Sequence, residues 1–121
     1  MKQLLFLMLA TFSLKSFADV TFSNGLVAST VWETELKTKT PAVLRLEFTQ
    51  DEKVVALAQA PLVTPKMKMG HHEHGTAPVE IAEVGTGIYR VSDMKLFMAG
   101  TWSIDIAVDG EVQTFTVEVE E

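Results

Sequence analysis

The chain has 121 residues, of which 47% are hydrophobic and 21% charged, and it contains no cysteine. This composition is typical of a globular protein, and the length suits one domain because domains cluster near roughly 100–150 residues. The absence of cysteine excludes disulfides, thiolate metal ligands and a cysteine nucleophile. The formal net charge of −6 argues against a nucleic-acid partner, which would need a basic protein face.

Residues 1–18 have the pattern of a bacterial secretory signal peptide. A lysine near the start precedes an apolar run over residues 4–14, and Ser16-Phe17-Ala18 puts small residues where a signal peptidase reads the chain. The run is shorter than the ~20 residues of a spanning helix, and Lys15 interrupts it, which disfavours an uncleaved anchor. We therefore expect cleavage before Asp19, a periplasmic or secreted location, no membrane span after cleavage, and one domain over residues 19–121.

Apolar residues recur at every second position through much of the remaining chain, which predicts strands with one buried and one solvent-facing side. In chain order, the expected strands cover residues 26–34, 44–48, 54–58, 62–67, 79–84, 88–91, 102–108 and 115–119. Two glycine-containing segments, Gly85-Thr86-Gly87 and Asp109-Gly110, are typical hairpin turns, and the second suits a type I′ turn.

Seven or eight short strands without helical periodicity predict an all-β fold, an immunoglobulin-like antiparallel β-sandwich. A small β-barrel is the alternative. Trp32 is expected to be a core ring. The other side chains expected to be mostly buried are Leu44, Leu46, Phe48, Tyr89, Trp102, Ile104, Ile106, Phe115, Val117 and Val119.

The segment over residues 65–78, PKMKMGHHEHGTAP, breaks the alternation and is the candidate metal site. It is polar and punctuated by glycine, which predicts an irregular segment and not a full strand. It contains every histidine of the protein and two methionines, so the candidate ligands are Met67, Met69, His71, His72 and His74. Dense histidine indicates metal binding, and thioether sulfur is a soft donor that suits Cu(I).

Copper, with Cu(I) favoured, is the predicted ion, and Cu(II) or zinc bound by the three histidines is the alternative. In the structural alternative, Met67 and Met69 are flexible core fillers and the segment binds nothing. Met94, Leu96 and Met98 also alternate and are expected to form a strand face that packs in the core. Met98 would add a sulfur ligand if its strand ran beside the Met/His segment.

These motifs together resemble the YtkA-like domain family and the related periplasmic domain of FixH-type proteins. The resemblance covers about residues 42–119. The matching positions are Met67, Met69, Gly70, His71, His72, His74, Pro78, Gly87, Tyr89, Met98, Gly100 and Trp102. It implies an exported immunoglobulin-like sandwich, and FixH-type relatives are associated with copper supply to a haem–copper oxidase. Those relatives keep a membrane-spanning helix, and many carry proline where this chain has Ala99.

We therefore expect an exported metal-binding module: a periplasmic copper carrier, buffer, or resistance or oxidase-assembly accessory. Its partners would be the metal ion and a copper-receiving or copper-exporting envelope protein. The alternative is a non-catalytic structural or protein-interaction domain of the cell envelope with no specific metal. An enzyme is not expected, because the chain lacks a G-x-S-x-G elbow, a Walker A loop and an H-E-x-x-H motif.

Overall fold

The structure is a computed structural model that describes residues 17–69, 72–75 and 78–121, with side chains described for 18–67 and 78–121. Within these residues the chain forms ten strands and contains no helix with the length and hydropathy of a membrane span. The strands are β1 (Phe17–Thr21), β2 (Val27–Trp32), β3 (Ala42–Gln50), β4 (Lys53–Val54), β5 (Leu62–Met69), β6 (His72–Gly75), β7 (Glu80–Gly85), β8 (Ile88–Met94), β9 (Gly100–Val108) and β10 (Glu111–Val119).

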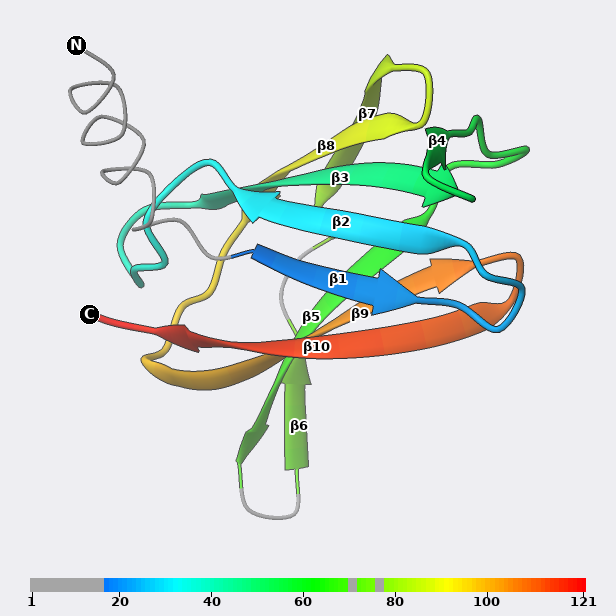
Figure 1. The fold of residues 1–121 in the computed structure, drawn as a ribbon. Coiled ribbons are helices and arrows are strands. Elements are labelled where there is room, and N and C mark those ends of the chain that lie inside the picture. Colours follow the sequence, from blue (N-terminus) through cyan, green and yellow to red (C-terminus); the bar gives the residue numbers. More distant parts are fainter. Residues whose placement is uncertain (1–16, 70–71, 76–77) are drawn as a thin grey trace, which may run out of the picture.

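The strands form two antiparallel sheets that pack face to face (Figure 1). The first sheet has the order β1-β2-β3-β8-β7, with β4 added beside β3, and the second has the order β10-β9-β5-β6. The chain therefore crosses between the sheets after β4, after β6 and after β8. This arrangement confirms the predicted β-sandwich, with two strands that were not expected, β1 and β6.

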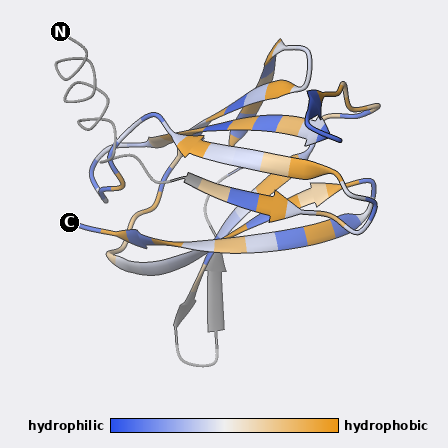
Figure 2. Cartoon of the chain, viewed as in Figure 1, coloured by the Kyte–Doolittle hydropathy of each residue, from blue (hydrophilic) through white to orange (hydrophobic). Residues whose placement is uncertain are grey.

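The core lies between the sheets and is built from alternate residues of the strands. Along β9, every second residue from Trp102 to Val108 is buried, and β3 shows the same alternation from Ala42 to Phe48. Figure 2 shows the alternation as bands of opposite hydropathy along the strands. The predicted core residues that are buried are Trp32, Leu44, Leu46, Phe48, Tyr89, Trp102, Ile104, Ile106, Val117 and Val119.

Phe115 is half-buried, whereas the alternation predicted that it would be a mostly buried core residue. Its strand, β10, is the edge strand of the second sheet. Phe115 therefore reaches the other sheet from the rim of the sandwich, where its ring packs against Trp32 with the centroids 6.4 Å apart. The alternation correctly predicted that this side chain points inward. The edge position of its strand leaves the ring partly exposed to solvent.

Both predicted turns connect neighbouring strands. Asp109 and Gly110 join β9 to β10 with φ angles of 52° and 84°, as a type I′ turn requires at its two central residues. Gly87 lies in the turn between β7 and β8 with φ of 70°. A Cβ at Gly87 would lie 2.2 Å from the carbonyl oxygen of Val55, so this close approach of two backbones requires glycine.

The strand predicted over residues 54–58 is wrong beyond its first residue, because β4 ends at Val54. Phe48 of β3 is the point at which β4 meets β8. Its amide donates to the carbonyl of Gly87 at 2.9 Å, and its carbonyl accepts from the amide of Val55 at 3.0 Å. From Glu47 back to Ala42, the backbone of β3 on this side is already paired with β8. The chain after Val55 therefore cannot continue to pair with β3.

Strand β1 begins at Phe17 and so includes the last two residues of the predicted signal peptide. Ala18 pairs with the buried Thr30 of β2. The Thr30 hydroxyl donates to the Ala18 carbonyl at 2.8 Å and accepts from the Ala18 amide at 3.1 Å. Cleavage before Asp19 would therefore remove both of these hydrogen-bond partners and leave β1 with residues 19–21.

Glu111 links the turn after β1 to the start of β10. The amide and hydroxyl of Ser23 donate to its carboxylate at 2.9 and 2.7 Å, and the Gln113 side chain donates at 2.9 Å. The hydroxyl of Ser23 first, and then Gln113, hold the pKa of Glu111 below its ordinary value.

Because this pKa is lowered in the folded state, the stabilising contribution is present above the ordinary glutamate pKa and is lost as pH falls through the lowered value. We expect Ser23→Ala to return the Glu111 pKa toward its ordinary value and to reduce the acid-induced loss of stability. An NMR titration of the Glu111 carboxyl measures this. Thr114→Ala, which removes an exposed hydrogen bond to Asp105, is the control. An unchanged Glu111 pKa in Ser23→Ala would contradict the conclusion that the Ser23 hydroxyl lowers this pKa.

Candidate metal centre

The Met/His segment contains a β-hairpin, and the prediction of an irregular segment over residues 65–78 is wrong for most of its length. Residues 65–69 continue β5, and residues 72–75 form β6. Strand β9 pairs with β5 as far as Met67, and β6 pairs with the end of β5, so these polar residues gain partners that composition alone does not indicate. The hairpin extends beyond the other strands of the sandwich (Figure 1).

The register of this hairpin places each methionine opposite a histidine. Met67 pairs with His74, and Met69 pairs with His72. On its other side, Met67 pairs with Trp102 of β9. One row of register positions therefore runs across three strands, from His74 through Met67 to Trp102.

Met67 lies at the margin of the core, where 9% of the residue is exposed and it belongs to the buried apolar cluster. Gly100, at the start of β9, has a φ of 132° and leaves space for it. A Cβ at Gly100 would lie 2.7 Å from Cε of Met67, closer than real Cβ contacts occur. The thioether methyl of Met67 thus lies against the backbone of Gly100.

Met98 lies in the connection between β8 and β9 and packs half-buried against the core. The strand expected from Met94 to Met98 is therefore wrong after its first residue, because β8 stops at Met94. Met94 and Leu96 are nevertheless buried in the core, as predicted. The Met98 carbonyl accepts a hydrogen bond from Nε1 of Trp102 at 2.8 Å. Phe97 packs edge-on against the same indole, with centroids 5.4 Å apart. Met98 lies two residues before the start of β9, the strand that pairs with β5.

The remaining predicted ligands are placed by strand and register. His71 lies outside the described residues, and the side chains of Met69, His72 and His74 lie outside those that the structure describes. Among the residues that are described, no three His, Asp or Glu gather at one point. The candidate site therefore rests on the packing of Met67 and Met98 and on the hairpin register.

Among the described side chains of β5, the charge next to Met67 is that of Lys66, on the outer face of the sheet. Lys66 forms an ion pair with Asp105 at 3.1 Å, and Asp105 also accepts a hydrogen bond from Thr114 at 2.7 Å. Successive residues of a strand point to opposite faces, so the buried Met67 faces inward while Lys66 faces outward. The described surroundings of the Met67 thioether are consequently apolar.

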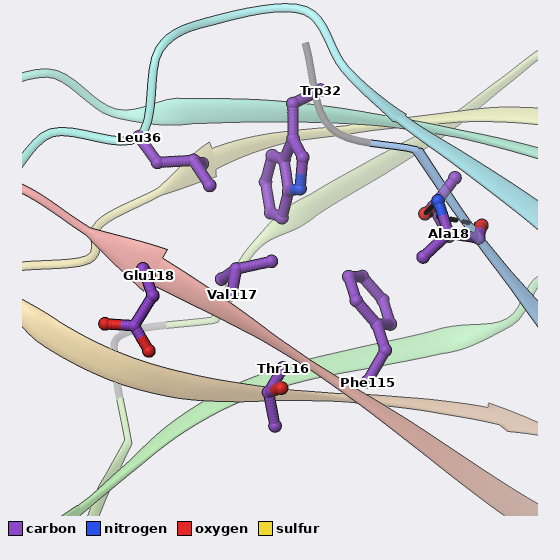
Figure 3. Close-up of a pocket in the computed structure, with 8 residues that line it drawn as sticks. Ala18, Trp32, Leu36, Phe115, Thr116, Val117 and Glu118 are labelled. Carbon is purple, nitrogen blue, oxygen red and sulfur yellow. Dashed lines mark hydrogen bonds between the residues drawn. The ribbon is translucent and has the colours of Figure 1, made fainter. Parts of the chain in front are cut away.

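A separate pocket of about 390 Å³ opens at the opposite edge of the same sheet, beside β10. The apolar side chains of Trp32, Leu36 and Phe115 converge on it (Figure 3). Its described lining holds one carboxylate, Glu118, and neither methionine nor histidine. This pocket adds no donor to the candidate metal centre.

Two residues contribute to the candidate centre in ways that sequence reasoning missed. Trp102 was expected as a core ring, and besides being buried it bonds the Met98 carbonyl. Gly100 makes room for Met67. The hydrogen bond from Trp102 to the Met98 carbonyl had a signal in the sequence, because the two residues are only four positions apart. The second depends on the pairing of β5 with β9, which no local pattern reveals.

The fold and this centre define a class: an antiparallel β-sandwich domain that carries a methionine/histidine hairpin at one edge of its second sheet. A family model described as YtkA-like matches residues 24–107, a range that includes the hairpin, Met98 and Gly100. The chain therefore belongs to the YtkA-like family, as its motifs indicated. No curated protein and no solved structure matches the chain in the same comparisons.

Proposed function

We propose that this protein is an exported copper-binding module that holds Cu(I) at the β5–β6 hairpin. The observation that carries the proposal is the register in which Met67 and Met69 stand opposite His74 and His72. Directly opposed residues in an antiparallel pair have Cβ atoms roughly 4.5–5.5 Å apart, which allows two side-chain donors to reach one ion. Met98 is proposed as an additional sulfur donor, and His71 as an additional imidazole donor.

The chemistry of these donors favours copper over the other common metals. Thioether sulfur is uncharged and soft, which suits Cu(I), whereas Ca²⁺ and Mg²⁺ prefer several oxygen ligands. The apolar surroundings of Met67 support the same preference, because a monovalent ion costs less to desolvate than a divalent one. Zinc bound by the histidines alone is the competing assignment.

The proposed role is that of a carrier, a buffer, or an accessory of copper resistance or oxidase assembly, without catalysis of its own. A ligand set without thiolate suits an oxidising compartment, where cysteine would be converted to disulfide. The proposed partner is an envelope protein that receives or exports copper.

The direct test is an anaerobic titration of the purified protein with Cu(I) against a competing chelator. We expect one Cu(I) per chain, bound more tightly than by a synthetic peptide of residues 65–78. This peptide is the matched control, because it carries the same hairpin donors without Met98 and without the strand pairing that sets the register. Equal affinity of the protein and the peptide would favour the alternative, an envelope interaction domain with no specific metal.

A further inference from the structure

We propose, resting on the copper function above, that Gly100 is a positioning residue of the metal centre. The space left by its missing side chain seats the thioether methyl of Met67 and so sets where the Met67 sulfur lies. Gly100 would itself bind nothing. Its contribution would be to hold the donor in place before the ion arrives.

The contact between the two residues is close and specific. A Cβ at Gly100 would lie 2.7 Å from Cε of Met67, so no larger residue fits there without moving the methionine. The Met67 sulfur is bonded directly to that Cε. A methionine side chain is flexible, and the contact of its terminal methyl with Gly100 restricts the positions that the sulfur next to that methyl can take.

The start of β9 also interacts with Met98, the second proposed sulfur donor. Trp102 is the register partner of Met67 and bonds the Met98 carbonyl, while Gly100 lies between Met98 and Trp102 in the chain. The segment over residues 98–102 therefore contacts the methyl of Met67 and fixes the backbone of Met98. Donors that are ordered in the metal-free protein lose less entropy on binding, which raises affinity.

The test compares Gly100→Ala with Gly110→Ala. Gly110 also has a positive φ, of 84° against 132° at Gly100, and a Cβ there would have no neighbour within 4 Å, so this control tests an alanine at positive φ without the contact. In Gly100→Ala we expect the Met67 methyl resonance of the metal-free protein to shift and Cu(I) affinity to fall about 10–100-fold, as for other residues that orient metal ligands. Gly110→Ala should leave both unchanged.

A double-mutant cycle separates positioning from general packing. In a Met67→Leu background, Gly100→Ala should cause no further loss of Cu(I) affinity, because the positioned sulfur is already absent. A second full loss would overturn the proposal. So would an unshifted Met67 methyl in Gly100→Ala, or a shifted methyl with unchanged Cu(I) affinity.

The parent protein provides a measurement that does not depend on the variant folding. The Met67 methyl should give nuclear Overhauser contacts to the α-protons of Gly100 both without metal and with Cu(I) bound. Loss of these contacts on loading would overturn the proposal. If the parent binds no Cu(I), the copper function and this role fall together. The metal-free contacts would then identify Gly100 as a packing residue. If the parent binds Cu(I) and Gly100→Ala binds it as tightly, the copper function stands and only this role fails.

Discussion

Replacing Trp102 with alanine is expected to lower the free energy of unfolding by about 3–5 kcal/mol. The residue is fully buried and stands in the second sheet between its register partners Met67 and Val117. Truncation would leave a cavity there and would also leave the Met98 carbonyl without its hydrogen-bond donor. Denaturant unfolding followed by circular dichroism measures the change.

Phe97→Ala is the matched control for this prediction. Phe97 packs against the same indole from outside the core and is 48% exposed. Its removal deletes an edge-on ring contact without opening a cavity, so we expect a loss of about 1 kcal/mol. A cost below about 1 kcal/mol for Trp102→Ala would show that the indole does not anchor the core.

Replacing Met67 and Met69 together by leucine is expected to weaken Cu(I) binding at least ~100-fold, equivalent to about 2.7 kcal/mol. The proposed site would lose its soft donors and with them its preference for Cu(I), leaving weaker Cu(II) or zinc binding by the histidines. Leucine retains most of the apolar volume, so stability should fall by less than about 1.5 kcal/mol. Competition titrations with Cu(I) and zinc measure both affinities.

Met94→Leu is the control for the methionine pair. Met94 is fully buried at the end of β8, so this substitution makes the same chemical change in the core outside the proposed site. It should leave Cu(I) affinity unaltered. If the Met67/Met69 variant bound Cu(I) as tightly as the parent, both methionines would be packing residues and the mixed sulfur–nitrogen site would be wrong.

The parts of the fold that could be predicted are those governed by neighbours in the chain. Alternation over residues 102–108 predicts a strand with one buried face because successive side chains point to opposite sides, and β9 follows that pattern. Asp109-Gly110 predicts a tight turn because both residues tolerate positive φ, and it joins β9 to β10. The candidate ligands Met67 and Met98 could be proposed from donor chemistry, which needs no coordinates.

The sequence by itself determined the all-β class, the main strands, most of the core and membership of the YtkA-like family. Only the tertiary structure decided that β4 stops at Val54, that Phe115 is half-buried because its strand is an edge strand, and that the Met/His segment contains a hairpin. It also brought Met67 against Gly100, more than thirty positions away in the chain. The physical reason is common to all four: each depends on which strands lie side by side in a sheet. That choice is made by pairing between distant segments, and the local pattern of side chains does not encode it.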